Sequence, residues 1–108
     1  MEKDRRSAPR ARVKLPARWE GAASRENATV TDLSRNGCFV LTGGKVEVKE
    51  LVRLEIQLAD NQTLNFWTEV VNEAPEIGFA VKFNSSSPED EAALAKYLEG
   101  IFGSPATK

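Results

Sequence analysis

The feature that most constrains the fold of this sequence is a repeated alternation of hydrophobic and polar residues in short segments. A period of two places the hydrophobic side chains on one face of a β-strand. The alternation recurs in six segments, with hydrophobic positions at Val13 and Leu15; Ala28 and Val30; Cys38 to Leu41; Val52, Leu54, Ile56 and Leu58; Leu64, Phe66 and Val70; and Ile77, Phe79, Val81 and Phe83. Turn-forming residues separate the segments, so the sequence predicts a mainly β fold, a small six-stranded antiparallel β-barrel.

The segment Ser87–Phe102 departs from this alternation and predicts one C-terminal α-helix. Ser87 is the expected N-cap, Pro88 occupies the first helical position, and Gly103 is the residue expected to end the helix. The hydrophobic positions recur at spacings of four and three residues: Leu94, Leu98 and Ile101. We expect this face to pack across the barrel, and the alternative is a helix that binds a partner or forms a dimer.

The length and charge of the chain indicate one globular domain with an uneven charge distribution. At 108 residues the chain is long enough for one core, and no hydrophobic run approaches the length of a membrane helix or a signal peptide. We therefore expect a cytoplasmic protein without membrane insertion. Residues 1–18 carry a net charge of +5 and the remaining 90 residues a net charge of −6. A local basic segment on an acidic body favours a compact anion bound at one place over long nucleic acid.

The sequence offers little support for catalysis or metal binding. It has no histidine, and its one cysteine, Cys38, lies within a hydrophobic segment, where a buried and unreactive side chain is expected. No carboxylates are clustered at the spacing of a metal site. Trp67 points away from Phe66 and Val70 in a regular strand, and we expect it to contact the core or the helix. An exposed stacking surface or a partner contact is the alternative.

Two short motifs stand out on this chain. The first is the RxxxR string Arg6-Ser7-Ala8-Pro9-Arg10, and the second is Asp32-Leu33-Ser34-Arg35-Asn36-Gly37. The second motif begins 22 residues after Arg10 and leads directly into the hydrophobic segment 38–41. Either motif is common by chance, but their order and spacing make the combination more specific.

The residue types of these motifs suit a phosphate ligand that carries guanine. An arginine fork donates two parallel hydrogen bonds to a phosphate or to the O6/N7 edge of guanine. An aspartate accepts hydrogen bonds from guanine N1–H and the exocyclic amine. Ser34 can donate to a phosphate oxygen or cap the turn, and Gly37 can adopt a positive φ or let backbone N–H groups approach the ligand closely. A plain hairpin turn, with Asn36 and Gly37 both at positive φ, is the alternative for this segment, and both roles are compatible.

The conformation of the first motif follows in part from its proline. Pro9 disfavours the α region for Ala8, so we expect residues 6–10 to be extended, with Arg6 and Arg10 on one side and about 13 Å apart. This span suits contact with a dinucleotide better than contact with a single phosphate. A basic arm with few hydrophobic residues is expected to become ordered when its ligand binds.

In their order and spacing, the two motifs resemble those of the PilZ family of bacterial cyclic di-GMP receptors. Glu76–Phe83 is similar to the final barrel strand of that family, and the predicted helix lies where many members carry one. The resemblance covers nearly the whole chain and implies a six-stranded β-barrel. Carried over by position, it implies these ligand-binding residues: Arg5, Arg6, Arg10, Asp32, Ser34 and Gly37.

Further expectations follow from this resemblance. An arginine at the position of Arg5 accompanies binding of an intercalated ligand dimer in the family, which implies two stacked molecules of cyclic di-GMP per site. Ser7-Ala8-Pro9 departs from the bulkier hydrophobic or aromatic residues often found between the arginines. The implied organisation is a flexible basic arm over residues 1–12, a barrel with its helix over residues 13–103, and a tail over residues 104–108.

The function implied is that of a single-domain receptor, without enzymatic activity or cofactor, that signals through an unidentified protein partner. The main alternative is a PilZ-like adaptor that acts in motility or pilus function without nucleotide. A barrel that binds single-stranded nucleic acid is a further alternative, which the acidic body and the few aromatic residues disfavour.

Overall fold

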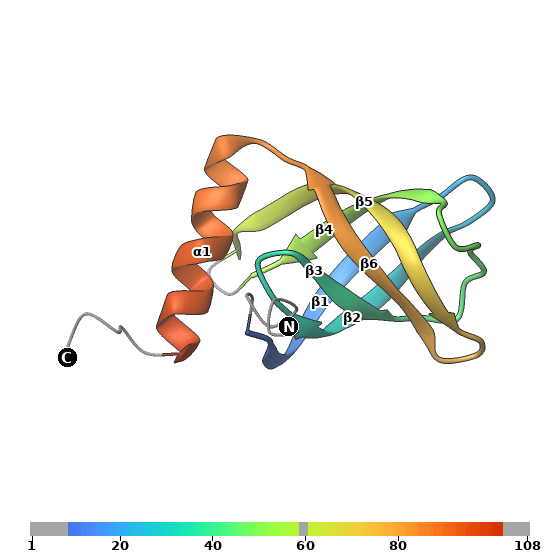
Figure 1. Ribbon diagram of the computed structural model, residues 1–108, viewed down its shortest axis with the longest axis horizontal. Coiled ribbons are helices and arrows are strands. Elements are labelled where there is room, and N and C mark those ends of the chain that lie inside the picture. Colours follow the sequence, from blue (N-terminus) through green and yellow to red (C-terminus); the bar gives the residue numbers. More distant parts are fainter. Residues whose placement is uncertain (1–8, 59–60, 103–108) are drawn as a thin grey trace, which may run out of the picture.

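The computed structural model describes residues 9–58 and 61–102, which form a barrel of six strands and one helix (Figure 1). The elements are β1 Ala11–Glu20, β2 Arg25–Leu33, β3 Gly37–Leu41, β4 Leu51–Gln57, β5 Thr63–Ala74, β6 Gly78–Ser85 and α1 Pro88–Phe102. Around the closed barrel the strands follow the order β1-β2-β3-β6-β5-β4, and every neighbouring pair is antiparallel. The predicted fold class is therefore confirmed.

The alternation in the sequence builds the core of the barrel. In β4, Val52, Leu54 and Ile56 are buried, whereas the residues between them are exposed. Near one end of the barrel the rings of Trp19 and Phe79 meet edge to face, with their centroids 5.1 Å apart. Hydrophobic burial of this kind contributes about 25 cal/mol per Å2 of apolar surface removed from water, so the inward positions dominate the stability of the fold.

Helix α1 covers one end of the barrel (Figure 1). Ser87 Oγ accepts a hydrogen bond from the backbone N–H of Asp90 at 3.0 Å, which confirms the predicted N-cap. Leu94 and Leu98 are buried, so the helix packs on the barrel as expected. Ile101, placed on the same face by its spacing, is 43% exposed, because the helix packs through its middle and leaves its last turn in solvent.

Two expectations need correction. The barrel was expected to begin at residue 13, but β1 already begins at Ala11, whose side chain is buried. Trp67 does point away from the core, because odd-numbered residues face outward in this part of β5. The expected contact with the core is therefore wrong, whereas Trp67 lines one cavity together with Ser87 and Asp90 at the start of α1. Its side chain is 49% exposed. Gly103 and the tail over residues 104–108 lie outside the described residues.

Candidate functional site

A surface cavity of about 290 Å3 brings together four of the six predicted site residues: Arg10, Asp32, Ser34 and Gly37. Arg10 lies directly before β1, Asp32 lies near the end of β2, and the turn that contains Ser34 leads into β3 at Gly37. The two motifs, well separated in the sequence, thus meet beside one hollow. Arg5 and Arg6 lie outside the described residues, as does most of the arm over residues 1–12.

The turn between β2 and β3 is held by the side chain of Ser34, which is buried. Its Oγ accepts hydrogen bonds from the backbone N–H groups of Asn36 at 3.1 Å and Gly37 at 3.2 Å. The Ser34 backbone N–H donates to the carbonyl oxygen of Gly37 at 2.9 Å, and the hydroxyl lies 3.3 Å from the same oxygen. Of the two roles considered for Ser34, capping of the turn is therefore the one that the structure shows.

The plain turn considered as the alternative for this segment is present between β2 and β3, but the positive φ considered for Asn36 and Gly37 is not. Neither residue has a positive φ, whereas Lys49, Asn61 and Glu76 do. The Ser34 side chain supplies the hydrogen bonds that close this turn, so no left-handed residue is required. Gly37 is needed for close approach, because a Cβ atom there would overlap with the carbonyl oxygen of Val81 in β6.

Asp32 lines the cavity together with Cys38. In the β2–β3 register Asp32 is opposite Phe39, and in the β1–β2 register it is opposite Arg12. Burial raises the pKa of the Cys38 thiol well above its usual range, and the nearby Asp32 carboxylate raises it further. Cys38 therefore lines the cavity as a neutral thiol, as its hydrophobic surroundings in the sequence predicted.

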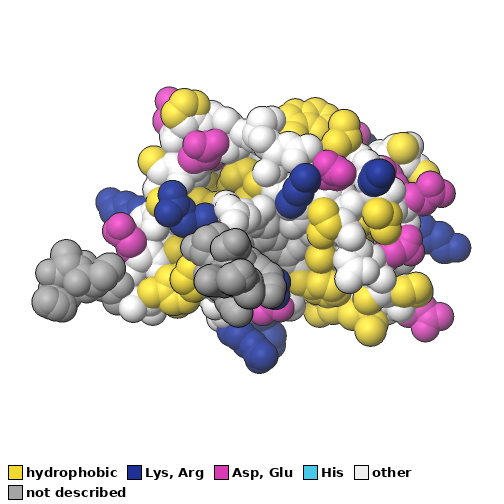
Figure 2. All heavy atoms as spheres, viewed as in Figure 1, with side chains coloured by type: hydrophobic (Ala, Val, Ile, Leu, Met, Phe, Trp, Pro, Cys, Tyr) yellow, Lys and Arg dark blue, Asp and Glu magenta, His cyan; other side chains and the backbone are white. Residues whose placement is uncertain are grey.

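The cavity has further lining residues that the motifs do not contain, among them Phe39, Val71, Ala80 and Lys82. Lys82 is opposite Gly37 in the β3–β6 register, and its Nζ lies 3.8 Å from Glu69 Oε1. Figure 2 shows hydrophobic side chains on the visible surface of the barrel, with both basic and acidic side chains among them. The sequence indicated that Lys82 faces outward, because it alternates with the hydrophobic residues of the segment 77–83. It did not indicate which strand pairs with this segment.

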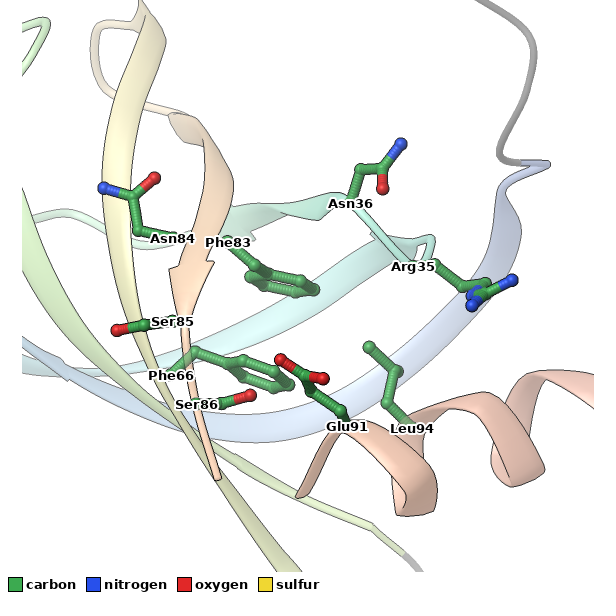
Figure 3. Close-up of a pocket in the computed structure, with 9 residues that line it drawn as sticks. All are labelled: Arg35, Asn36, Phe66, Phe83, Asn84, Ser85, Ser86, Glu91 and Leu94. Atoms are coloured by element: carbon green, nitrogen blue, oxygen red, sulfur yellow. The ribbon is translucent and has the colours of Figure 1, made fainter. Parts of the chain in front are cut away.

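A second cavity of about 250 Å3 lies between the same turn and helix α1 (Figure 3). The stacked rings of Phe66 and Phe83, with centroids 4.1 Å apart, form one wall. Arg35 lines this second cavity and not the first, so it points away from its neighbours in the motif. Asn36 lines both cavities, and its carbonyl oxygen accepts a hydrogen bond from the Phe83 backbone N–H at 2.8 Å.

The described residues contain no group of three or more histidine, cysteine, aspartate or glutamate side chains able to hold a metal ion. Within the same part of the chain, no helix has both the length and the hydrophobicity needed to cross a membrane. The residues around the cavity of about 290 Å3 suit one class of ligand. Arg10 and Lys82 supply cations for an anion, and Asp32 supplies an acceptor for hydrogen-bond donors that the anion carries.

Comparison with known structures finds the same fold in several bacterial proteins. The inhibitor of motility MotI (DgrA) of Bacillus subtilis aligns with a TM-score of 0.74 and 19% identity, over 86% of this chain and 48% of that one. YcgR of Escherichia coli in complex with c-di-GMP gives 0.76 and 16%, over 91% and 46%. The MrkH–c-di-GMP complex of K. pneumonia gives 0.73 and 16%, over 89% and 51%.

This chain therefore spans about half the length of each of these three proteins. No curated protein matches it by sequence. The PilZ domain model matches residues 4–100, a range that contains both motifs, all six strands and most of α1. The family suggested by the motifs is confirmed, and the chain belongs to the PilZ domain family.

Proposed function

We propose that this protein is a receptor for cyclic di-GMP that binds its ligand at the cavity between Arg10 and the β2–β3 turn. The observation that carries the proposal is the meeting of Arg10, Asp32 and the turn beside one cavity. The proposed binding residues are those of the two motifs and the preceding arginine: Arg5, Arg6, Arg10, Asp32, Ser34 and Gly37. The solved complexes of YcgR and MrkH with c-di-GMP support this ligand.

The chemistry of the cavity matches the groups that cyclic di-GMP presents. Arg10 supplies a permanent cation with a planar fork for a phosphate or for the O6/N7 edge of guanine. Asp32 supplies an acceptor for the guanine N1–H and amino groups, which adenine lacks in this arrangement. Ser34 acts through the turn, because its Oγ already accepts two backbone hydrogen bonds. It holds the backbone that the ligand meets.

The first motif completes the site in this proposal. Ligand binding brings Arg5 and Arg6 to the cavity that Arg10 lines and orders the basic arm over it. Two stacked ligand molecules per site follow from the arginine at position 5, and calorimetric stoichiometry measures this directly. The receptor carries out no reaction and needs no cofactor. A changed surface then passes the signal to a protein partner in the cytoplasm.

One observation favours a second candidate, an adaptor that acts in motility or pilus function without nucleotide. Ser34 and Gly37 both have roles that need no ligand. Ser34 closes the turn, and Gly37 allows β3 to approach β6. The positions of Ser34 and Gly37 are therefore explained by the fold alone, whereas the convergence of Arg10 and Asp32 on one cavity is not.

Calorimetric titration with cyclic di-GMP tests the proposal. The titration is run beside GTP, cyclic di-AMP and an Arg10→Ala variant, with Lys96→Ala as a matched control because Lys96 is exposed on α1. Saturable binding of cyclic di-GMP alone, lost in Arg10→Ala and kept in Lys96→Ala, supports the receptor. The absence of heat and of any ligand-induced rise in melting temperature would move the assignment to the adaptor.

A further inference from the structure

A second surface of the barrel, on the outer face of β1, β4 and β5, carries a stacked pair of large side chains. Arg53 of β4 is directly opposite Trp67 of β5, and its guanidinium carbon lies 5.7 Å from the centroid of a Trp67 ring. Trp67 is 49% exposed. Leu51, two residues before Arg53 on the same outer face, is 57% exposed. A large aromatic ring left in solvent beside an aliphatic side chain is typical of a contact surface.

This surface, which we name the Trp67 face, continues into a hollow of about 140 Å3 lined by Arg18, Arg25 and Arg53. Glu20 and Glu55 line the same hollow. Glu55 Oε1 lies 4.0 Å from Arg18, so one of the three arginines is already matched by a carboxylate. Among the described residues, no ion pair holds Arg25 or Arg53. The hollow thus offers two guanidinium groups beside an exposed indole.

The Trp67 face lies on the other half of the barrel wall from the candidate ligand site. In the closed strand order, β5, β4 and β1 follow one another, whereas the ligand cavity is built mainly on β2, β3 and β6. Arg18, Arg53 and Trp67 do not line the ligand cavity. The function of this face is therefore separate from ligand binding.

We propose that the Trp67 face binds an acidic segment of a partner protein that places a hydrophobic side chain on Trp67 and carboxylates on Arg25 and Arg53. Arginine forks pair with carboxylates through two hydrogen bonds, and tryptophan and arginine are the residues that contribute most at protein interfaces. The hollow has three arginines against two glutamates on a body whose last 90 residues carry a net charge of −6, so this part of the surface attracts an acidic segment.

The glutamates of this face argue against nucleic acid as the occupant. Glu20 and Glu55 stand among the arginines, where a continuous row of phosphates meets repulsion at each carboxylate. A peptide carries carboxylates only at some of its residues, so it can pair with the arginines without placing a negative charge beside Glu20 or Glu55. Binding of single strands also uses several stacked aromatic side chains along a groove, and Trp67 is the one aromatic residue with a large exposed fraction on the described part of this face.

Fluorescence anisotropy with short labelled peptides tests this proposal on the full chain. The probes are a peptide of glutamate and leucine, the same peptide with glutamine in place of glutamate, and an oligothymidylate. Arg53→Ala and Trp67→Ala are the test variants. Lys96→Ala and Ile77→Ala are their matched controls, because Lys96 is exposed on α1 and Ile77 is 54% exposed in the β5–β6 turn.

We expect saturable binding of the acidic peptide, weakened by added salt and about tenfold weaker in each test variant. Acrylamide quenching of tryptophan fluorescence should fall on binding, because Trp67 becomes covered while Trp19 is already buried. Binding that is absent, or equally strong with the glutamine peptide, overturns the proposal. Equal losses in the control variants also overturn it, and tighter binding of the oligothymidylate through Arg53 and Trp67 assigns the face to nucleic acid instead.

Discussion

Ser34 and Gly37 hold each other in place at the edge of the ligand cavity. The Gly37 backbone N–H donates to Ser34 Oγ at 3.2 Å, while the Ser34 backbone N–H donates to the Gly37 carbonyl oxygen at 2.9 Å. Two residues of one motif are thus joined in both directions. These two hydrogen bonds restrict the conformation of the turn. They also set the direction in which β3 leaves it.

Replacing Ser34 by alanine is expected to destabilise the protein by about 1–2 kcal/mol, because the N–H groups of Asn36 and Gly37 lose their acceptor in a partly buried turn. Urea unfolding measures the change. Ser86→Ala is the control, since within residues 9–58 and 61–102 the Ser86 hydroxyl makes one hydrogen bond, a long one of 3.5 Å to the Ser87 carbonyl oxygen. Equal stability of the two variants would contradict the role assigned to Ser34.

Replacing Gly37 by alanine is expected to cost about 1–3 kcal/mol, because the added methyl group must displace the β6 backbone at Val81. Gly43→Ala is the matched control, because nothing lies within 4 Å of a Cβ atom at that position. Thermal unfolding of both variants gives the comparison. A melting temperature of the Gly37 variant as high as that of the control would show that β3 and β6 separate at little cost.

The strands of this fold were predictable because each depends on a local pattern. Leu54 and Ile56 alternate with polar residues and are buried. The local sequence alone therefore indicates which face of this strand points to the core. The N-cap at Ser87 is equally local. The exposure of Trp67 was not predicted, because an aromatic ring gains free energy in several positions and its neighbours in the sequence do not decide between them.

The candidate site was predictable in its residues but not in its geometry. Arg10 and Asp32 were identified from the two motifs, and the fold brings them to one cavity. Lys82 and Val71 enter that cavity through pairing that is not local. Lys82 is placed by the β3–β6 register, and Val71 lies within an irregularity of the β5–β6 register between Val70 and Asn72. Neither feature has a signature in the neighbouring residues.

The raised pKa of Cys38 predicts how stability depends on pH. Because the folded chain keeps this thiol protonated, the unfolded chain loses a proton first as the pH rises above about 8.5, and the folded state is then progressively less favoured. Unfolding free energies should be unaffected by this group up to about pH 8.5 and should fall by about 1.4 kcal/mol per pH unit well above it. Cys38→Ala should remove that part of the slope, and an unchanged slope would contradict it.

The same burial predicts that Cys38 reacts slowly with iodoacetamide in the native protein. The reactive thiolate is scarce, and the side chain is 8% exposed. Labelling followed by mass spectrometry should proceed at the ordinary rate of a free thiol only in denaturant. Fast labelling under native conditions would show that β3 opens readily, and the Ser34→Ala variant is expected to shift the protein in that direction.

Lys82 is expected to contribute to cyclic di-GMP binding, because it lines the ligand cavity opposite Gly37. Its ammonium group lies 3.8 Å from Glu69 Oε1 and its side chain is more than half exposed, so it can turn toward a phosphate at small cost. Lys82→Ala should weaken binding by about fivefold, equivalent to ~1 kcal/mol, and Lys82→Arg should largely preserve it.

Glu69→Gln should strengthen binding, because it removes the competing carboxylate and raises the local electrostatic potential. Titration of these three variants beside Lys96→Ala separates a contact in the cavity from a general effect of charge. Equal affinities of Lys82→Ala and Lys96→Ala would exclude Lys82 from the site and leave the arginines and Asp32 to bind the ligand.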